Sequence, residues 1–153
     1  MRNRLIQSCI TVCLLSVFAL TEAVGWPTPD CRLTHVARLA CPFIHNNIFH
    51  LAANLCALWT FKRRISLAIF PIAILTAFLP GCENTVGFSS AICAHLGITW
   101  GRAGQFSGMC RSLAVPLVIV GLLPGINMLI HFYALFIGYF FAEATWKTRL
   151  RKI

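Results

Sequence analysis

The chain has 153 residues, of which 58% are hydrophobic and 11% are charged, and its formal net charge is +9. Soluble domains have about 45–50% apolar and about 25% charged residues, so this chain has too few charges to cover a surface that faces water. The same apolar content excludes an intrinsically disordered chain. The composition therefore predicts a membrane protein, with lipid as its main partner.

Basic residues dominate the charges, with 13 Lys and Arg against four Asp and Glu. In a soluble protein this surplus would suggest a nucleic-acid partner, but here the basic residues stand in short clusters between apolar runs. Such clusters mark the cytoplasmic ends of membrane helices. We therefore expect a multi-pass integral membrane protein with no nucleic-acid partner.

The apolar runs predict an all-α fold with six membrane helices. A spanning helix needs about 20 apolar residues, or somewhat fewer where the bilayer thins or the helix lies within a bundle. Residues 25–42, which are rich in proline, read as a loop with a short interfacial turn. A single domain, residues 1–153, accounts for the chain, and its expected helices cover residues 5–23, 47–61, 65–79, 89–101, 109–123 and 126–146.

The first segment has two interpretations. Residues 5–23 follow Arg2 and Arg4 and also fit a secretory signal peptide. We favour a retained helix, because the other helices need an amino-terminal partner to pack against.

The long apolar run over residues 113–142 decides the topology. Pro124-Gly125 divides this run into the last two helices. With six helices and a cytoplasmic amino terminus, eleven of the 13 Lys and Arg lie inside and only Arg32 and Arg38 lie outside. One kinked helix would instead place the basic carboxy-terminal segment outside, against the positive-inside rule. We expect both termini in the cytoplasm and, from the compactness of the chain, a bacterial inner membrane.

Most of the eight cysteines lie within or beside apolar runs, as small hydrophobic residues do. Cys31, Cys41 and Cys82 fall in expected outer loops, where a disulfide is left open. No cysteine pair has metal-binding spacing, so we expect neither a metal nor another cofactor.

Four polar residues stand where lipid should exclude them, and the topology puts all four toward the outer side of the bilayer. Ionisable groups in membrane helices are costly and usually functional. His131 on the sixth helix can take the proton of the Ser89 hydroxyl on the fourth, which would activate that serine as a nucleophile. His50 and Asn54, one helical turn apart, can donate to a developing oxyanion with the Ser89 backbone N–H. Gly87 gives the backbone before the serine the latitude to approach those donors.

Small residues predict that the fourth and sixth helices pack closely. Ala134, Gly138 and Ala142 follow His131 on one face of the sixth helix. The fourth helix offers a similar stripe with Ala94 and Gly97.

Three stretches, in chain order, carry a recognisable set of motifs. Residues 45–54 have the pattern H-x4-H-x3-N, residues 87–90 read Gly-Phe-Ser-Ser, and residues 131–138 have the pattern H-x-x-A-x-x-x-G. Together they resemble the rhomboid family of intramembrane serine proteases, whose patterns are H-x4-H-x3-N, G-x-S-G and H-x-x-G-x-x-x-G. Ser90 and Ala134 replace family glycines, but both remain small, so close packing should survive.

The resemblance implies a six-helix bundle whose serine lies below the membrane surface in a cavity that water can enter. It implies an endopeptidase that cleaves single-span membrane proteins near the outer ends of their helices. Residue by residue, it assigns Ser89 as nucleophile, His131 as general base and acid, and His50 with Asn54 as oxyanion donors.

Other interpretations stay open. Each of these polar residues can instead hold helices together, and we expect His45 to order its loop or to support His50. The alternative function is a non-catalytic rhomboid-like protein that binds and escorts membrane helices, although such relatives usually lack the serine or the histidine. A channel would have polar groups along a pore through the whole membrane, whereas here the polar groups gather toward the outer side of the bilayer. We expect a monomer.

Overall fold

The regular elements of the chain are helical throughout the residues that the structure, a computed structural model, describes: 2–25, 35–82, 85–121 and 126–150. The prediction of an all-α fold is therefore confirmed for this part of the chain. In chain order the elements are α1 (Arg2–Val24), α2 (His35–Ala40), the 3₁₀ helix η1 (Cys41–Phe43), α3 (Ile48–Thr60), α4 (Ile69–Thr76), α5 (Ser89–Ala103), α6 (Phe106–Gly121) and α7 (Met128–Leu150).

The long apolar run near the carboxy terminus forms two helices, as the charge pattern predicts. α6 ends at Gly121 and α7 begins at Met128. The expected turn at Pro124-Gly125 falls between them, outside the described residues.

Two boundaries differ from the predicted ones. The expected loop over residues 25–42 contains α2 and most of η1. α4 is shorter than the expected 65–79, because tight turns flank it: Ile69 N donates to Ser66 O, and Leu79 N donates to Thr76 O. Pro71 lies in the first turn of α4, where a missing N–H removes no intrahelical bond.

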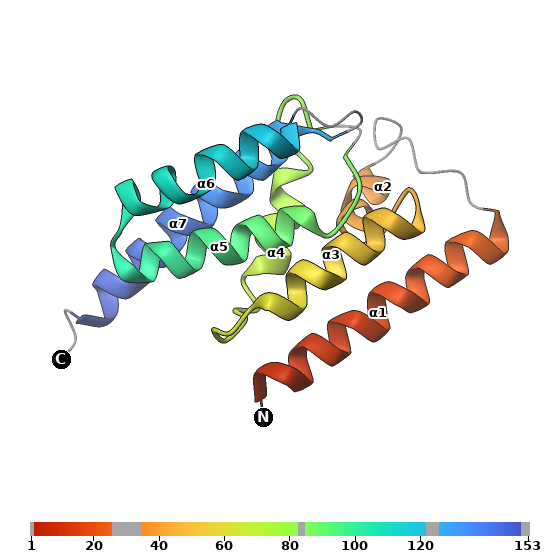
Figure 1. Ribbon diagram of the computed structural model, residues 1–153, viewed down its shortest axis with the longest axis horizontal. Helices are drawn as coiled ribbons and strands as arrows, with labels where there is room; N and C mark the ends of the chain where they lie inside the picture. The colour runs from red at the N-terminus through yellow and green to blue at the C-terminus, as the bar shows by residue number, and fades with distance from the viewer. Residues whose placement is uncertain (1, 26–34, 83–84, 122–125, 151–153) are drawn as a thin grey trace.

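The helices pack around the pair α5 and α7, which makes the most extensive contact in the molecule. Figure 1 shows α1 along one side of α3, with α3 next to α5. α6 covers the other side of the α5–α7 pair, and α4 packs against both α5 and α7. The pair α5 and α7 therefore forms the centre of the fold.

Polar side chains are buried and large apolar ones are exposed. Among the polar residues that pack inside are Gln7, Asn54, Thr76 and His131, each 5% exposed or less. Large apolar side chains face outward from α1, α3, α4 and α7, for example Leu5, Val12, Leu20, Phe49, Leu75 and Phe140. This distribution is typical of chains whose surroundings are lipid, because lipid tails solvate apolar side chains and not polar ones.

Within the described part of the chain, two helices are long and apolar enough to cross a membrane: α1 over Asn3–Val24 and α7 over Met128–Thr145. α3 is apolar but has only 13 residues. A helix of that length rises about 20 Å, less than the ~30 Å hydrocarbon core of a typical bilayer. Length and composition thus support two spans, and the six-span bundle remains a prediction.

Candidate active site

The central helices α5 and α7 run parallel, so their amino-terminal ends lie at the same end of the pair. Gly138 on α7 lies against the backbone of Ala94 on α5: a Cβ on Gly138 would come 2.5 Å from the Ala94 carbonyl oxygen. Further along, Gly97 approaches the backbone of Leu135, and Gly101 approaches that of Tyr139. Glycine permits this spacing because any side chain would force the two backbones apart.

Ala134 lies one turn before Gly138 on α7, and its side chain is fully buried in the core. The predicted close approach of the helices that carry Ser89 and His131 is confirmed at Gly138, which lies against Ala94.

Ser89 and His131 meet at this shared end. Ser89 is the first residue of α5 and His131 is the fourth residue of α7. The His131 Nε2 atom lies 2.8 Å from the Ser89 Oγ atom, which is hydrogen-bond distance. His131 is 5% exposed, whereas Ser89 is partly exposed. The imidazole is thus within hydrogen-bond distance of a partly exposed serine, which is the geometry that general-base activation of a serine requires.

The backbone before Ser89 lies directly over the other two candidate residues. A Cβ on Gly87 would come 2.6 Å from His50 Nε2 and 3.5 Å from Asn54 Nδ2. Gly87 has φ +113°, a conformation that side chains disfavour, so glycine is required here both for its backbone angle and for lack of space. The structure thus places His50 and Asn54 against Gly87, which precedes Ser89 by two residues in the chain.

The Asn54 amide is a hydrogen-bond donor without an internal partner. Asn54 is 5% exposed, and its Nδ2 atom is buried and makes no hydrogen bond among the described residues. A buried donor without a partner costs roughly 1–3 kcal/mol, and such groups persist mainly where function needs them. A carbonyl oxygen presented beside Gly87 would satisfy this amide.

Two contacts fix the Gly87–Phe88 backbone, one from η1 and one from the segment that follows it. Gly87 N donates to Cys41 O at 2.9 Å, and Phe88 N donates to His45 Nε2 at 3.4 Å. The His45 ring also contacts the His50 ring edge to face, with centroids 5.1 Å apart. His45 therefore contacts both His50 and the Phe88 backbone, and its expected role in supporting His50 stays a prediction.

Burial keeps His45 in the neutral form that this bond requires. Desolvation, with a smaller contribution from the facing His50 ring, lowers the pKa of His45 to about 4, against an opposing contribution from the Phe43 backbone. Neutral imidazole has one nitrogen that can accept a hydrogen bond, and Nε2 fills that role here.

Two helix N-caps near the site were not predicted from the sequence. Asn47 caps α3: its Oδ1 accepts from His50 N at 2.8 Å, which orients the first turn that carries His50. Asn127 does the same for α7, where its Oδ1 accepts from Leu129 N at 3.0 Å, and its Nδ2 donates to Gly81 O. Both asparagines stand directly before an apolar run, which is the usual signal for an N-cap.

The cysteines of the expected outer loops differ from one another in the structure. Cys41 is disulfide-bonded, Cys82 is buried, and Cys31 lies outside the described residues. His95 lies away from the dyad, with its ring 4.2 Å from that of Phe61. Within the described ranges no group of three or more His, Cys, Asp or Glu side chains is placed to hold a metal ion. The expectation of a reaction without metal or cofactor stays a prediction.

The geometry is therefore that of a serine and a histidine at the amino-terminal ends of two parallel helices, with two further nitrogen donors beside the preceding glycine. No protein-family model matches the chain, and neither the curated proteins nor the solved structures include a similar one.

Proposed function

We propose that this protein is an intramembrane serine endopeptidase that cleaves membrane-spanning segments of other proteins. The observation that carries the proposal is the 2.8 Å contact between His131 Nε2 and Ser89 Oγ, made at the amino-terminal ends of two tightly packed apolar helices. The motif resemblance to the rhomboid family supports it independently, because the residues that the resemblance names are the ones that meet.

The proposed reaction begins with proton transfer. His131 Nε2 takes the Ser89 hydroxyl proton as Oγ bonds to the scissile carbonyl carbon. The carbonyl oxygen becomes an oxyanion. His131 then gives the proton to the leaving amine as the C–N bond breaks, and water, activated by the same imidazole, releases the acyl group from Ser89.

Stabilisation of the oxyanion is assigned to fixed donors. The Ser89 N–H is at the first position of α5, where backbone N–H groups have no intrahelical acceptor. The positive end of the helix dipole favours negative charge at the same place. The Asn54 amide and the His50 ring, both beside Gly87, complete the set. Such donors typically supply 10²–10³-fold in rate each.

The proposal includes the membrane setting. We infer a single multi-pass domain in which the six helices α1, α3, α4, α5, α6 and α7 cross the bilayer, both termini are cytoplasmic, and the dyad faces the outer leaflet. The apolar outer surface supports this setting, and the short helices α3 and α4 require local thinning of the bilayer or shielding within the bundle. Single-span membrane proteins are the proposed substrates.

The test is covalent labelling of the purified full chain in detergent with a fluorophosphonate probe. Wild type should be labelled on Ser89, whereas Ser89→Ala and His131→Ala should not be labelled. Ser90→Ala is the matched control, because Ser90 is buried beside Ser89 and its labelling should equal that of wild type. Labelling that persists in Ser89→Ala would refute the assignment of the nucleophile.

A protein that binds and escorts membrane helices is the alternative. It would use the same bundle without chemistry. A folded wild type that captures a single-span protein but neither cleaves it nor reacts with the probe would favour this alternative.

A further inference from the structure

A cavity of about 330 Å³ lies between α1 and the rest of the bundle. Its walls come from α1 between Leu5 and Leu14, from Leu67 and Phe70, and from Phe43 and Phe88. Every lining residue is apolar or a cysteine. The rings of Phe43 and Phe88 each lie about 6 Å from that of Phe70, and the three together form one wall.

The cavity has a buried floor and is open along one side of α1, where Leu5, Cys9 and Cys13 are exposed. Leu5 and Leu67 are 66% and 67% exposed, whereas Phe88 and Leu14 are 1% exposed. From Leu5 to Leu14 the helix rises about 14 Å, roughly half of the ~30 Å hydrocarbon core. The cavity thus has the depth of one leaflet, which is the depth that one lipid acyl chain occupies.

Basic residues lie next to the end of the cavity that Leu5 and Leu67 line. Asn3 ties the start of α1 to the loop between α3 and α4: its Nδ2 donates to Phe61 O at 3.1 Å, and its Oδ1 accepts from Ile65 N at 3.0 Å. Figure 1 shows these two parts of the chain side by side. The exposed residues that they bring together, here named the basic cluster, are Arg4, Lys62, Arg63 and Arg64.

We propose that this cavity and the basic cluster form a binding site for one anionic phospholipid. One acyl chain enters the cavity past Leu5 and Leu67, and the phosphate headgroup binds the basic cluster at the membrane surface. Leu5 adjoins Arg4, and Leu67 follows Arg64 by three residues, so the charged part and the apolar part of the site are continuous.

The chemistry of the two parts selects this occupant. A wholly apolar cavity excludes headgroups, sugars and peptides, whose polar atoms would lose hydrogen bonds there. A second transmembrane helix is about 10 Å wide and needs far more space. Four clustered cations at a membrane surface favour an anionic over a zwitterionic lipid. The proposal is independent of the proposed peptidase activity.

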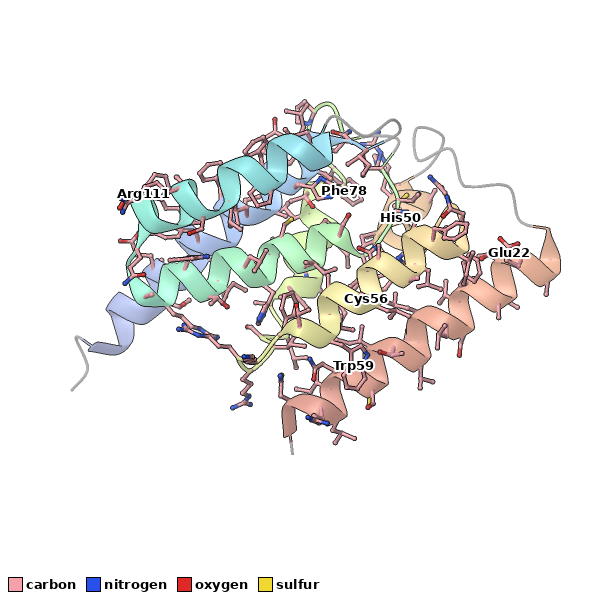
Figure 2. The ribbon with its side chains drawn as sticks, viewed as in Figure 1. Glu22, His50, Cys56, Trp59, Phe78 and Arg111 are labelled. Atoms are coloured by element: carbon pink, nitrogen blue, oxygen red, sulfur yellow. The ribbon has the colours of Figure 1, made fainter. Side chains whose placement is uncertain are left out.

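Two cysteines that line the cavity can report whether it is occupied. Cys9 and Cys13 line it as free, exposed thiols, while Cys56 is free and exposed on α3 and does not line it (Figure 2). The full chain in a neutral detergent is alkylated with N-ethylmaleimide while palmitoyl-oleoyl-phosphatidylglycerol is added, and each thiol is followed by mass spectrometry. Cys9 and Cys13 should react more slowly as the lipid is added, and Cys56 should keep its rate.

Two comparison ligands decide the result. Phosphatidylcholine with the same acyl chains should protect only at much higher concentration, and glycerol phosphate without acyl chains should not protect at all. Equal protection by both lipids would overturn the role of the basic cluster. Protection by glycerol phosphate alone, or no protection by either lipid, would overturn the lipid site itself.

Variants that remove single positive charges test whether the basic cluster binds the lipid headgroup. Arg63→Gln and Arg64→Gln should each raise the phosphatidylglycerol concentration needed for protection about fivefold, since each basic residue near a membrane surface contributes about that factor. Arg111→Gln, an exposed arginine on α6, is the matched control and should leave it unchanged. An equal effect of all three variants would show a general charge effect and contradict the proposal.

Discussion

The backbone of Gly87 lies against the ring of His50: a Cβ on Gly87 would come 2.5 Å from His50 Cε1 and 2.6 Å from its Nε2. This contact links the segment that leads into Ser89 to the helix that carries His50 and Asn54. Gly87 also has φ +113°, so its backbone angle and its lack of a side chain are both needed. The position of His50, a proposed oxyanion donor, relative to Ser89, the proposed nucleophile, therefore depends on Gly87.

Replacement of Gly87 by alanine should disable the site. The new Cβ must displace the His50 ring, and we expect fluorophosphonate labelling to slow by roughly 10²-fold or more, the usual effect of losing an oxyanion donor. Gly104→Ala is the control, because Gly104 also has a positive φ of 65° but has nothing within 4 Å. Both variants should lose stability from backbone strain, and only Gly87→Ala should lose reactivity. Equal labelling rates in the two variants would contradict this role.

Asn54→Ala tests the unpartnered amide. Because Asn54 Nδ2 is buried without an acceptor, its removal should cost little stability and should lower the labelling rate roughly 10²–10³-fold. Thermal unfolding and labelling kinetics measure the two effects. Asn46→Ala, an exposed asparagine in the segment before α3, should change neither. A structural hydrogen-bond role would give the opposite result, a lower melting temperature with an unchanged rate.

The sequence predicts most of the helices and the closeness of Ser89 and His131, because both follow from local rules. Apolar runs define the helices, and a serine and a histidine at the same depth in adjacent spans have few other partners. Glycine and alanine stripes in phase with these residues further predict the α5–α7 contact that joins them. All of these signals lie within single helices.

What the sequence does not predict comes from loops. α2 lies in a proline-rich stretch that reads as a loop, and six residues are too few for a periodic signal. The acceptor for Gly87 N is the Cys41 carbonyl, and a backbone group has no signature in the sequence. The lipid-sized cavity arises from the way α1 packs against Phe43 and Phe88, which no pattern within one helix encodes.

Gly138→Val tests the packing that brings Ser89 and His131 together. Its side chain would meet the Ala94 carbonyl, and overpacking of this kind typically costs about 1–3 kcal/mol. We expect a lower melting temperature and slower labelling together, since α5 and α7 must separate. Ala103→Val, an exposed position on α5, should affect neither. An unchanged labelling rate in a destabilised Gly138→Val would mean that the dyad does not depend on this contact.

His45 should make stability depend on pH. Its pKa is lowered to about 4 in the folded chain from 6.5, so between these values the unfolded chain binds more protons at this residue. The stabilisation is therefore fully present above pH 6.5 and is lost as the pH falls toward 4. Melting temperatures at pH 7.5, 5.5 and 4.5 should fall less steeply in His45→Gln than in wild type. His35→Gln, an exposed histidine, should keep the wild-type slope, and an equal slope in all three proteins would contradict the assignment.

The disulfide at Cys41 should protect the site through the backbone. Cys41 O accepts the bond from Gly87 N at 2.9 Å, so a constraint on Cys41 is also a constraint on the segment before Ser89. Cys41→Ser should lower the free energy of unfolding by about 2–4 kcal/mol, the usual contribution of a disulfide, and should slow labelling. A reducing agent should have the same two effects on wild type, while Cys56→Ser, which removes a free exposed thiol, should have neither. If reduction lowers the melting temperature but leaves the labelling rate unchanged, the Cys41 carbonyl holds Gly87 without help from the disulfide.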